Sequence, residues 1–156
     1  MNKIIQNTLF YVVVFCVTYF IYIYPVEILN ELLFNEKVNR RSSFYYTIII
    51  SILIIFYFRS YTSLKPLKIF IYEGMGIGFI SFWVVTAAIL IKGIFNFNSY
   101  YLGLLSLLFI LILSLISFYF GSKIYIKNIN IKSNKIKSDV SFIFLSDVHM
   151  GSNNIK

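Results

Sequence analysis

A short stretch near residue 150 contains the side-chain types that bind metal ions. Asp147 and His149 stand two positions apart, directly after an apolar run at residues 140–145 that only Ser141 interrupts. Such a run is typical of a buried strand, and residues two apart on a strand point to the same face. A carboxylate oxygen and an imidazole nitrogen together suit Zn, Mn or Fe. The spacing therefore predicts that Asp147 and His149 reach one metal ion, while Gly151 lets the backbone turn away beside it.

Residues 142–151, Phe-Ile-Phe-Leu-Ser-Asp-Val-His-Met-Gly, resemble the first motif of the calcineurin-like metallophosphoesterases. In that family a hydrophobic strand runs into Ser-Asp-x-His-x-Gly or a close variant, and several membrane-bound members carry hydrophobic spans ahead of the domain. The resemblance implies that Asp147 and His149 are metal ligands, with Asp147 bridging toward a second ion. It also implies two divalent ions (Mn, Fe or Zn), and a bound hydroxide that attacks phosphorus in line.

The later motifs of that family do not occur in this sequence: Gly-Asp-x-x-Asp, Gly-Asn-His-Asp/Glu, a further His and Gly-His-x-His. A segment of about 35 residues also buries too little surface to fold alone. We therefore expect residues 122–156 to be the start of an incomplete domain, with no complete catalytic set and no stable metal binding of its own. On this interpretation the chain alone is inactive and is the front part of a longer enzyme. The missing remainder of the phosphoesterase domain is then an expected partner.

The segment ahead of the motif has the pattern of another strand. Residues 124–136 alternate isoleucine with lysine and asparagine, with one slip in phase, which predicts a first strand before residues 140–145. Its lysines also suit an anionic lipid surface, at about 1 kcal/mol each.

Composition excludes a soluble domain. Of the 156 residues, 59% are hydrophobic and only 13% are charged, whereas soluble domains are about one quarter charged. The net charge of +8 comes from lysines and arginines that lie between apolar runs. This position indicates membrane-flanking charge and not nucleic-acid binding. A single cysteine rules out an internal disulfide framework.

Four apolar runs are candidates for crossing a bilayer, which takes about 20 residues of helix. They are residues 8–24, 44–58, 69–91 and 101–120. The predicted fold is therefore a membrane all-α region of about four transmembrane helices (residues 1–121), followed by the first strands of an α/β domain (residues 122–156). The first run ends at Pro25, and the bulky residues before it do not suit signal-peptide cleavage. For residues 26–37 a short interfacial helix and a partly ordered loop remain open.

The distribution of basic residues predicts the orientation. With four spans, one side carries nine of them: Lys3, Arg59, Lys65, Lys68, Lys123, Lys127, Lys132, Lys135 and Lys137. The other side carries four: Lys37, Arg40, Arg41 and Lys92. We therefore expect a multi-pass protein of the cell membrane with both termini in the cytoplasm.

Inside the predicted spans, Glu73 is the only charged residue, and it lies about one turn from the start of the third span. A carboxylate there is a candidate proton or ion site, although Lys65 and Lys68 nearby favour an interfacial carboxylate. Gly74 and Gly78 form a small-xxx-small pair, which predicts close approach of a helix, within the bundle or from a partner. No other buried charge, paired carboxylate or proline-broken helix is predicted, so the helices are interpreted as an anchor.

Three classes of function remain. The leading one is the membrane-anchored front end of a metallophosphoesterase that hydrolyses phosphate esters. The alternative is a complete small integral membrane protein that acts as a structural or interaction subunit, with the lipid bilayer as its surroundings. The third is a transporter that depends on Glu73.

Overall fold

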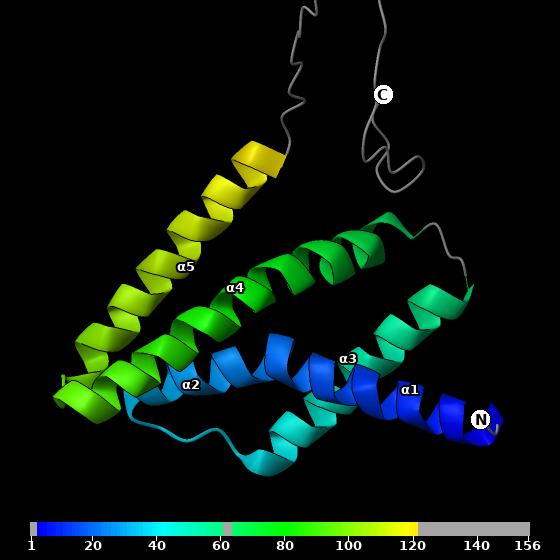
Figure 1. Cartoon of the computed structure of the whole chain (residues 1–156), viewed down its shortest axis with the longest axis horizontal. Helices are drawn as coiled ribbons and strands as arrows, with labels where there is room; N and C mark the ends of the chain where they lie inside the picture. The colour runs from blue at the N-terminus through cyan, green and yellow to red at the C-terminus, as the bar shows by residue number, and fades with distance from the viewer. Residues whose placement is uncertain (1–2, 61–63, 122–156) are drawn as a thin grey trace, which may run out of the picture. The chain divides into compact units, whose positions relative to one another are not determined.

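The computed structural model describes residues 3–60 and 64–121. These residues form α1 (Lys3–Thr18), the π-helix η1 (Tyr19–Ile23), α2 (Tyr24–Phe34), α3 (Arg40–Ser60), α4 (Lys65–Phe95) and α5 (Ser99–Gly121), as Figure 1 shows. No strand occurs among the described residues. The predicted strands at residues 124–136 and 140–145 lie outside them, and so does the proposed start of an α/β domain.

Four helices are long and apolar enough to cross a membrane. They are Ile5–Phe34, which joins α1, η1 and α2, then Arg40–Arg59, Lys65–Phe95 and Ser99–Gly121. Each contains one of the four predicted apolar runs, so the prediction of four such helices is confirmed for the described residues. The arrangement is compatible with a multi-pass membrane protein.

The first of these helices does not end at Pro25, and this prediction was wrong. Proline lacks an amide hydrogen, and its ring clashes with the carbonyl four residues earlier in a regular α-helix. Here the turn before Pro25 is widened, because the Tyr24 amide donates to the carbonyl of Tyr19, five residues earlier. Pro25 then occupies the first turn of α2, where a missing amide hydrogen is tolerated.

Residues 24–34 continue the helix, so a helix and not a loop follows Pro25. It stops at Asn35, which adopts the left-handed conformation and donates its amide to the carbonyl of Glu31 at 3.1 Å. Asn96 ends α4 in the same way, with a φ of 56°. Asparagine is one of the few residues with a side chain that accept this conformation.

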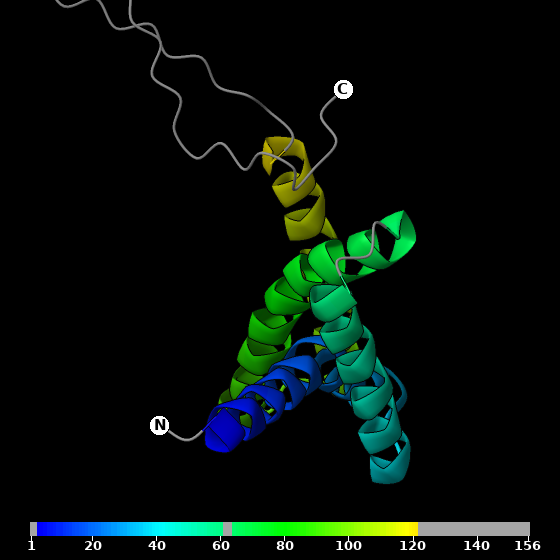
Figure 2. The same ribbon diagram turned by 90° about the vertical axis from the view of Figure 1, so that its right-hand side faces the viewer.

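The helices pack through small side chains. In the described part of the chain η1 lies against α4, α2 packs on α4 and α5, and α1 packs on α3 (Figures 1 and 2). At one of these contacts, a Cβ on Gly103 of α5 would lie 2.9 Å from Cδ2 of Leu33 in α2. Hydroxyl side chains are buried between the helices: Thr18, Ser43, Thr47, Ser51, Ser81, Ser106 and Ser114. Small residues at the contacts are typical of helices in membranes.

Large apolar side chains mostly lie on the outside. In the second half of α5, all residues from 107 to 121 are exposed except Ile110 and Ser114. Leu115, for example, is 61% exposed. Such a surface is unfavourable in water but suits the hydrocarbon interior of a bilayer.

Candidate functional site

The predicted metal ligands Asp147 and His149 lie outside the described residues. Within residues 3–60 and 64–121, no group of three or more His, Cys, Asp or Glu side chains could hold a metal ion. The two-metal site implied by the resemblance therefore stays a prediction. The described helices offer other polar and tightly packed features.

Glu73 is exposed on the outside of α4. Between Glu73 and Lys92 the helix carries no charged residue, a stretch of about 27 Å at 1.5 Å per residue. This length is close to the hydrocarbon thickness of a bilayer, about 30 Å. Glu73 and Lys92 are therefore spaced to lie near opposite interfaces, which fits an interfacial carboxylate better than an ion site inside the bundle.

The glycine pair of α4 faces η1 of the same chain. A Cβ on Gly74 would lie 2.8 Å from Cε1 of Tyr22, and one on Gly78 would lie 2.5 Å from Cγ2 of Ile21. The Cβ on Gly78 would also collide with the backbone carbonyl oxygen of Ile21. The close approach expected at Gly74 and Gly78 is thus made within the molecule, and a partner helix would have to displace η1.

The carbonyl group of Ile21 links this contact to Pro25. In a regular α-helix it would accept a hydrogen bond from the amide of residue 25, but proline has none to donate. The same oxygen lies where a Cβ on Gly78 would stand, so this position has no room for a side chain. A weak Cα–H···O contact is common where helices approach this closely. Gly78 therefore packs directly against the backbone of η1 just before Pro25.

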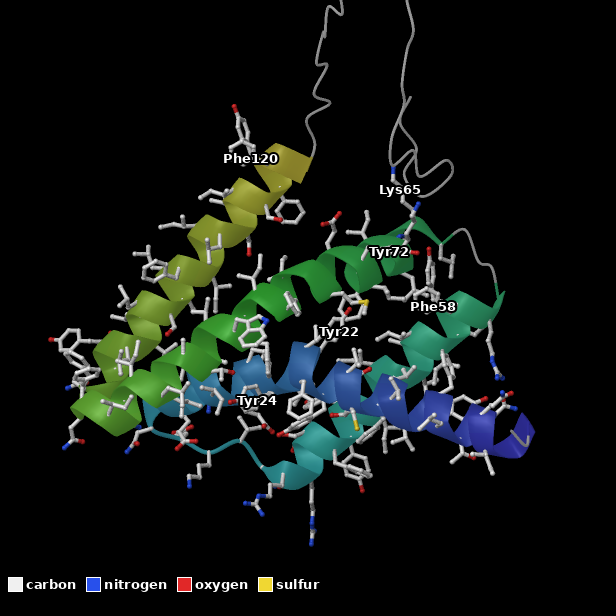
Figure 3. The ribbon with its side chains drawn as sticks, in the orientation of Figure 1. Tyr22, Tyr24, Phe58, Lys65, Tyr72 and Phe120 are labelled. Carbon is white, nitrogen blue, oxygen red and sulfur yellow. The ribbon has the colours of Figure 1, made fainter. Side chains whose placement is uncertain are left out.

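Tyr22 of η1 also contacts α4, near Gly74. Its hydroxyl donates a hydrogen bond to the backbone carbonyl of Ile71 in α4 at 2.9 Å. Its ring stacks on Phe70 with 5.6 Å between ring centroids and covers Gly74. Figure 3 labels this side chain between η1 and α4. Sequence reasoning missed Tyr22, because with 13 tyrosines in the chain no single one stands out.

Sequence reasoning also missed Glu27. This half-buried carboxylate lies in α2 and accepts a hydrogen bond from the Tyr19 hydroxyl at 2.8 Å. The two residues are eight apart, about two helical turns, so a continuous helix places them on one face. That spacing was readable in the sequence, but only for a helix that continues through Pro25.

Most buried hydroxyl groups bond within their own helix. Thr18, Thr47, Ser81 and Ser106 each donate to the carbonyl four residues earlier, at 2.7 to 2.8 Å. Among the described residues, only the hydroxyls of Ser51 and Ser114 are buried without a partner. These hydroxyls therefore allow close helix packing and do not form a continuous polar path through this part of the bundle.

Comparisons of the chain with family models, with curated proteins and with solved structures found no match. The function of the chain is therefore inferred from its own residues.

Proposed function

We propose that the four helices anchor a calcineurin-like metallophosphoesterase domain at the membrane, and that residues 122–156 begin this domain. The proposal depends mainly on residues 142–151, which place an aspartate and a histidine two apart after an apolar run. In the complete domain, Asp147 and His149 would bind divalent metal ions of the kind that suit carboxylate and imidazole ligands, Mn, Fe or Zn. Its reaction would be the hydrolysis of phosphate esters.

The composition of the helices supports a role as an anchor. Most of their buried hydroxyls bond within single helices, and Glu73 lies exposed near one end of its uncharged stretch. A transporter needs polar groups that line a path, usually facing the bundle interior or a water-filled cavity. The described helices have no such path, so the transporter is the weakest of the three classes.

The activity would belong to the complete domain. Its later motifs supply the remaining ligands in the family and do not occur among residues 1–156. In a two-metal site both ions act together on the attacking and leaving oxygens. Two ligands alone do not build such a site, so residues 1–156 by themselves are expected to hydrolyse nothing.

The coding sequence after Lys156 tests the proposal most directly. It should encode the later motifs, in the same or another frame, and unrelated sequence there would overturn the proposal. The joined product should then hydrolyse an aryl phosphate ester in the presence of Mn²⁺. Asp147→Asn should lower that activity by at least 100-fold, because loss of this ligand weakens metal binding and leaves the metal ion badly oriented. Asp139→Asn, at the other aspartate of the chain, is the matched control and should change little.

The second candidate is a complete membrane protein that acts as a structural or interaction subunit. The exposed second half of α5 favours it, since a protein partner could cover that surface as well as lipid could. On this view Asp147→Asn changes nothing that can be measured, while substitutions at Gly74 or Gly78 impair assembly. The two candidates therefore give opposite results for Asp147→Asn, whereas Gly78→Ala disturbs the contact with η1 on either view.

A further inference from the structure

Three basic side chains gather where α3 ends and α4 begins. Arg59 lies in the last turn of α3, and Lys65 and Lys68 lie in the first turn of α4. We call these three residues the basic end. Figure 3 labels Phe58, Lys65 and Tyr72 in this part of the molecule.

Aromatic contacts hold the basic end together. The ring of Tyr57 in α3 meets the ring of Tyr72 in α4, with 6.0 Å between centroids. The guanidinium of Arg59 lies over the ring of Tyr11 in α1, 5.4 Å from its centroid. A guanidinium on a ring face keeps its N–H groups at the edge free to donate. The contact between Tyr57 and Tyr72 therefore joins the last turns of α3 to the first turns of α4, and the three charges lie at this one end of the two helices.

The charges of the basic end are open to a ligand. Arg59 and Lys65 are exposed, Lys68 is half-buried, and no described carboxylate forms an ion pair with either lysine. The opposite end differs, because Glu27, Glu31 and Glu36 accompany its basic residues. The basic end has a single acidic neighbour in α4, Glu73.

The surroundings of the basic end match the headgroup region of a bilayer. Phe58 and Tyr72 are about half exposed beside the charges. Tyrosine is enriched at this depth, because its ring is apolar and its hydroxyl is wet. The uncharged stretch of α3 from residue 42 to residue 58 is about 25 Å long and ends at Arg59. A ligand here would meet cations beside exposed apolar rings.

We propose that the basic end binds the phosphate headgroup of an anionic phospholipid. Arg59, Lys65 and Lys68 supply the donors, and the neighbouring rings contact the upper part of the acyl chains. A free phosphate ion would use the cations but gain nothing from the rings. This site is independent of the proposed phosphoesterase activity and requires neither Asp147 nor His149.

The test uses the full chain, purified in a non-ionic detergent. Binding of phosphatidylglycerol and of phosphatidylcholine with identical acyl chains is measured by native mass spectrometry. The unsubstituted chain should prefer phosphatidylglycerol, and the preference should weaken as salt is raised. Replacing Arg59, Lys65 and Lys68 by glutamine should weaken phosphatidylglycerol binding about 5-fold per charge, or roughly 100-fold in total.

A matched variant with Lys37→Gln, Arg40→Gln and Arg41→Gln removes the same charge from the opposite end and should bind nearly as well as the unsubstituted chain. A charge-conserving variant, Arg59→Lys with Lys65→Arg and Lys68→Arg, should retain phosphatidylglycerol binding. Retained binding would show that substitution at these positions does not by itself misfold the protein. Equal loss in both glutamine variants would overturn the proposal, as would unchanged binding in the first. Competition by inorganic phosphate at the concentration of the lipid would also overturn it, because the site would then recognise a free anion.

Discussion

Two regions of the molecule differ in how closely they constrain their side chains. One is the contact between η1 and α4, which we call the crossing, and the other is the second half of α5. At the crossing, Gly78 lies against the backbone of Ile21, and Tyr22 bonds to the backbone of Ile71. In the second half of α5 nearly every side chain points away from the described helices. Both regions are strongly apolar, so hydrophobicity does not distinguish them. The size of the residues does, because two backbones can meet only where the side chains are small.

The largest effect is expected at Gly78. In Gly78→Ala the new methyl group would collide with a backbone carbonyl, which cannot rotate away as a side chain can. We expect a loss of about 3 kcal/mol in the free energy of unfolding, at the upper end for overpacked sites. Unfolding in mixed micelles with increasing dodecyl sulfate measures it.

Gly76→Ala is the matched control, because a Cβ at Gly76 meets nothing within 4 Å. It should leave stability unchanged or raise it slightly, since alanine favours helix by up to about 1 kcal/mol. Similar losses in the two variants would show that η1 does not pack on α4 as described.

A smaller effect is expected at Tyr22. Tyr22→Phe keeps the ring that stacks on Phe70 and removes the hydrogen bond to the Ile71 carbonyl. The expected loss is about 0.6 kcal/mol, the average for such bonds between membrane helices. The same unfolding measurement detects it, and Tyr101→Phe is the comparison, because Tyr101 is 69% exposed at the start of α5. A loss above about 2 kcal/mol would mean that the hydroxyl has a further role.

The smallest effect is expected in the second half of α5. Leu115 is 61% exposed, so Leu115→Ala should change the free energy of unfolding by less than about 0.5 kcal/mol. Leu102, which is 8% exposed where α5 meets its neighbours, is the control. Leu102→Ala should cost about 2 kcal/mol or more. A large loss at Leu115 would instead indicate that a partner protein covers this face.

Much of the helical region could be predicted from the sequence. The four spans follow from apolar runs without charge, and the close approach at Gly74 and Gly78 follows from their spacing. The path of the helix through Pro25 could not be predicted, since proline usually ends or kinks a helix. That one error hid the contact of Glu27, because a helix that ends at Pro25 separates this carboxylate from Tyr19 whether residues 26–37 form a second helix or a loop. The prediction of a metal site at Asp147 and His149 concerns residues outside the described helices and stays a prediction.

By itself, the sequence determined that this chain has four segments long and apolar enough to cross a membrane, because length and lack of charge in a segment are local properties. It also contained the paired Asp147 and His149 that motivate the phosphoesterase proposal. Only the tertiary structure decided which segment covers the glycines of α4. That choice depends on the widened turn before Pro25, which brings the Ile21 carbonyl and the Tyr22 ring to one face. Such a contact joins residues about 50 positions apart, and no local pattern specifies it.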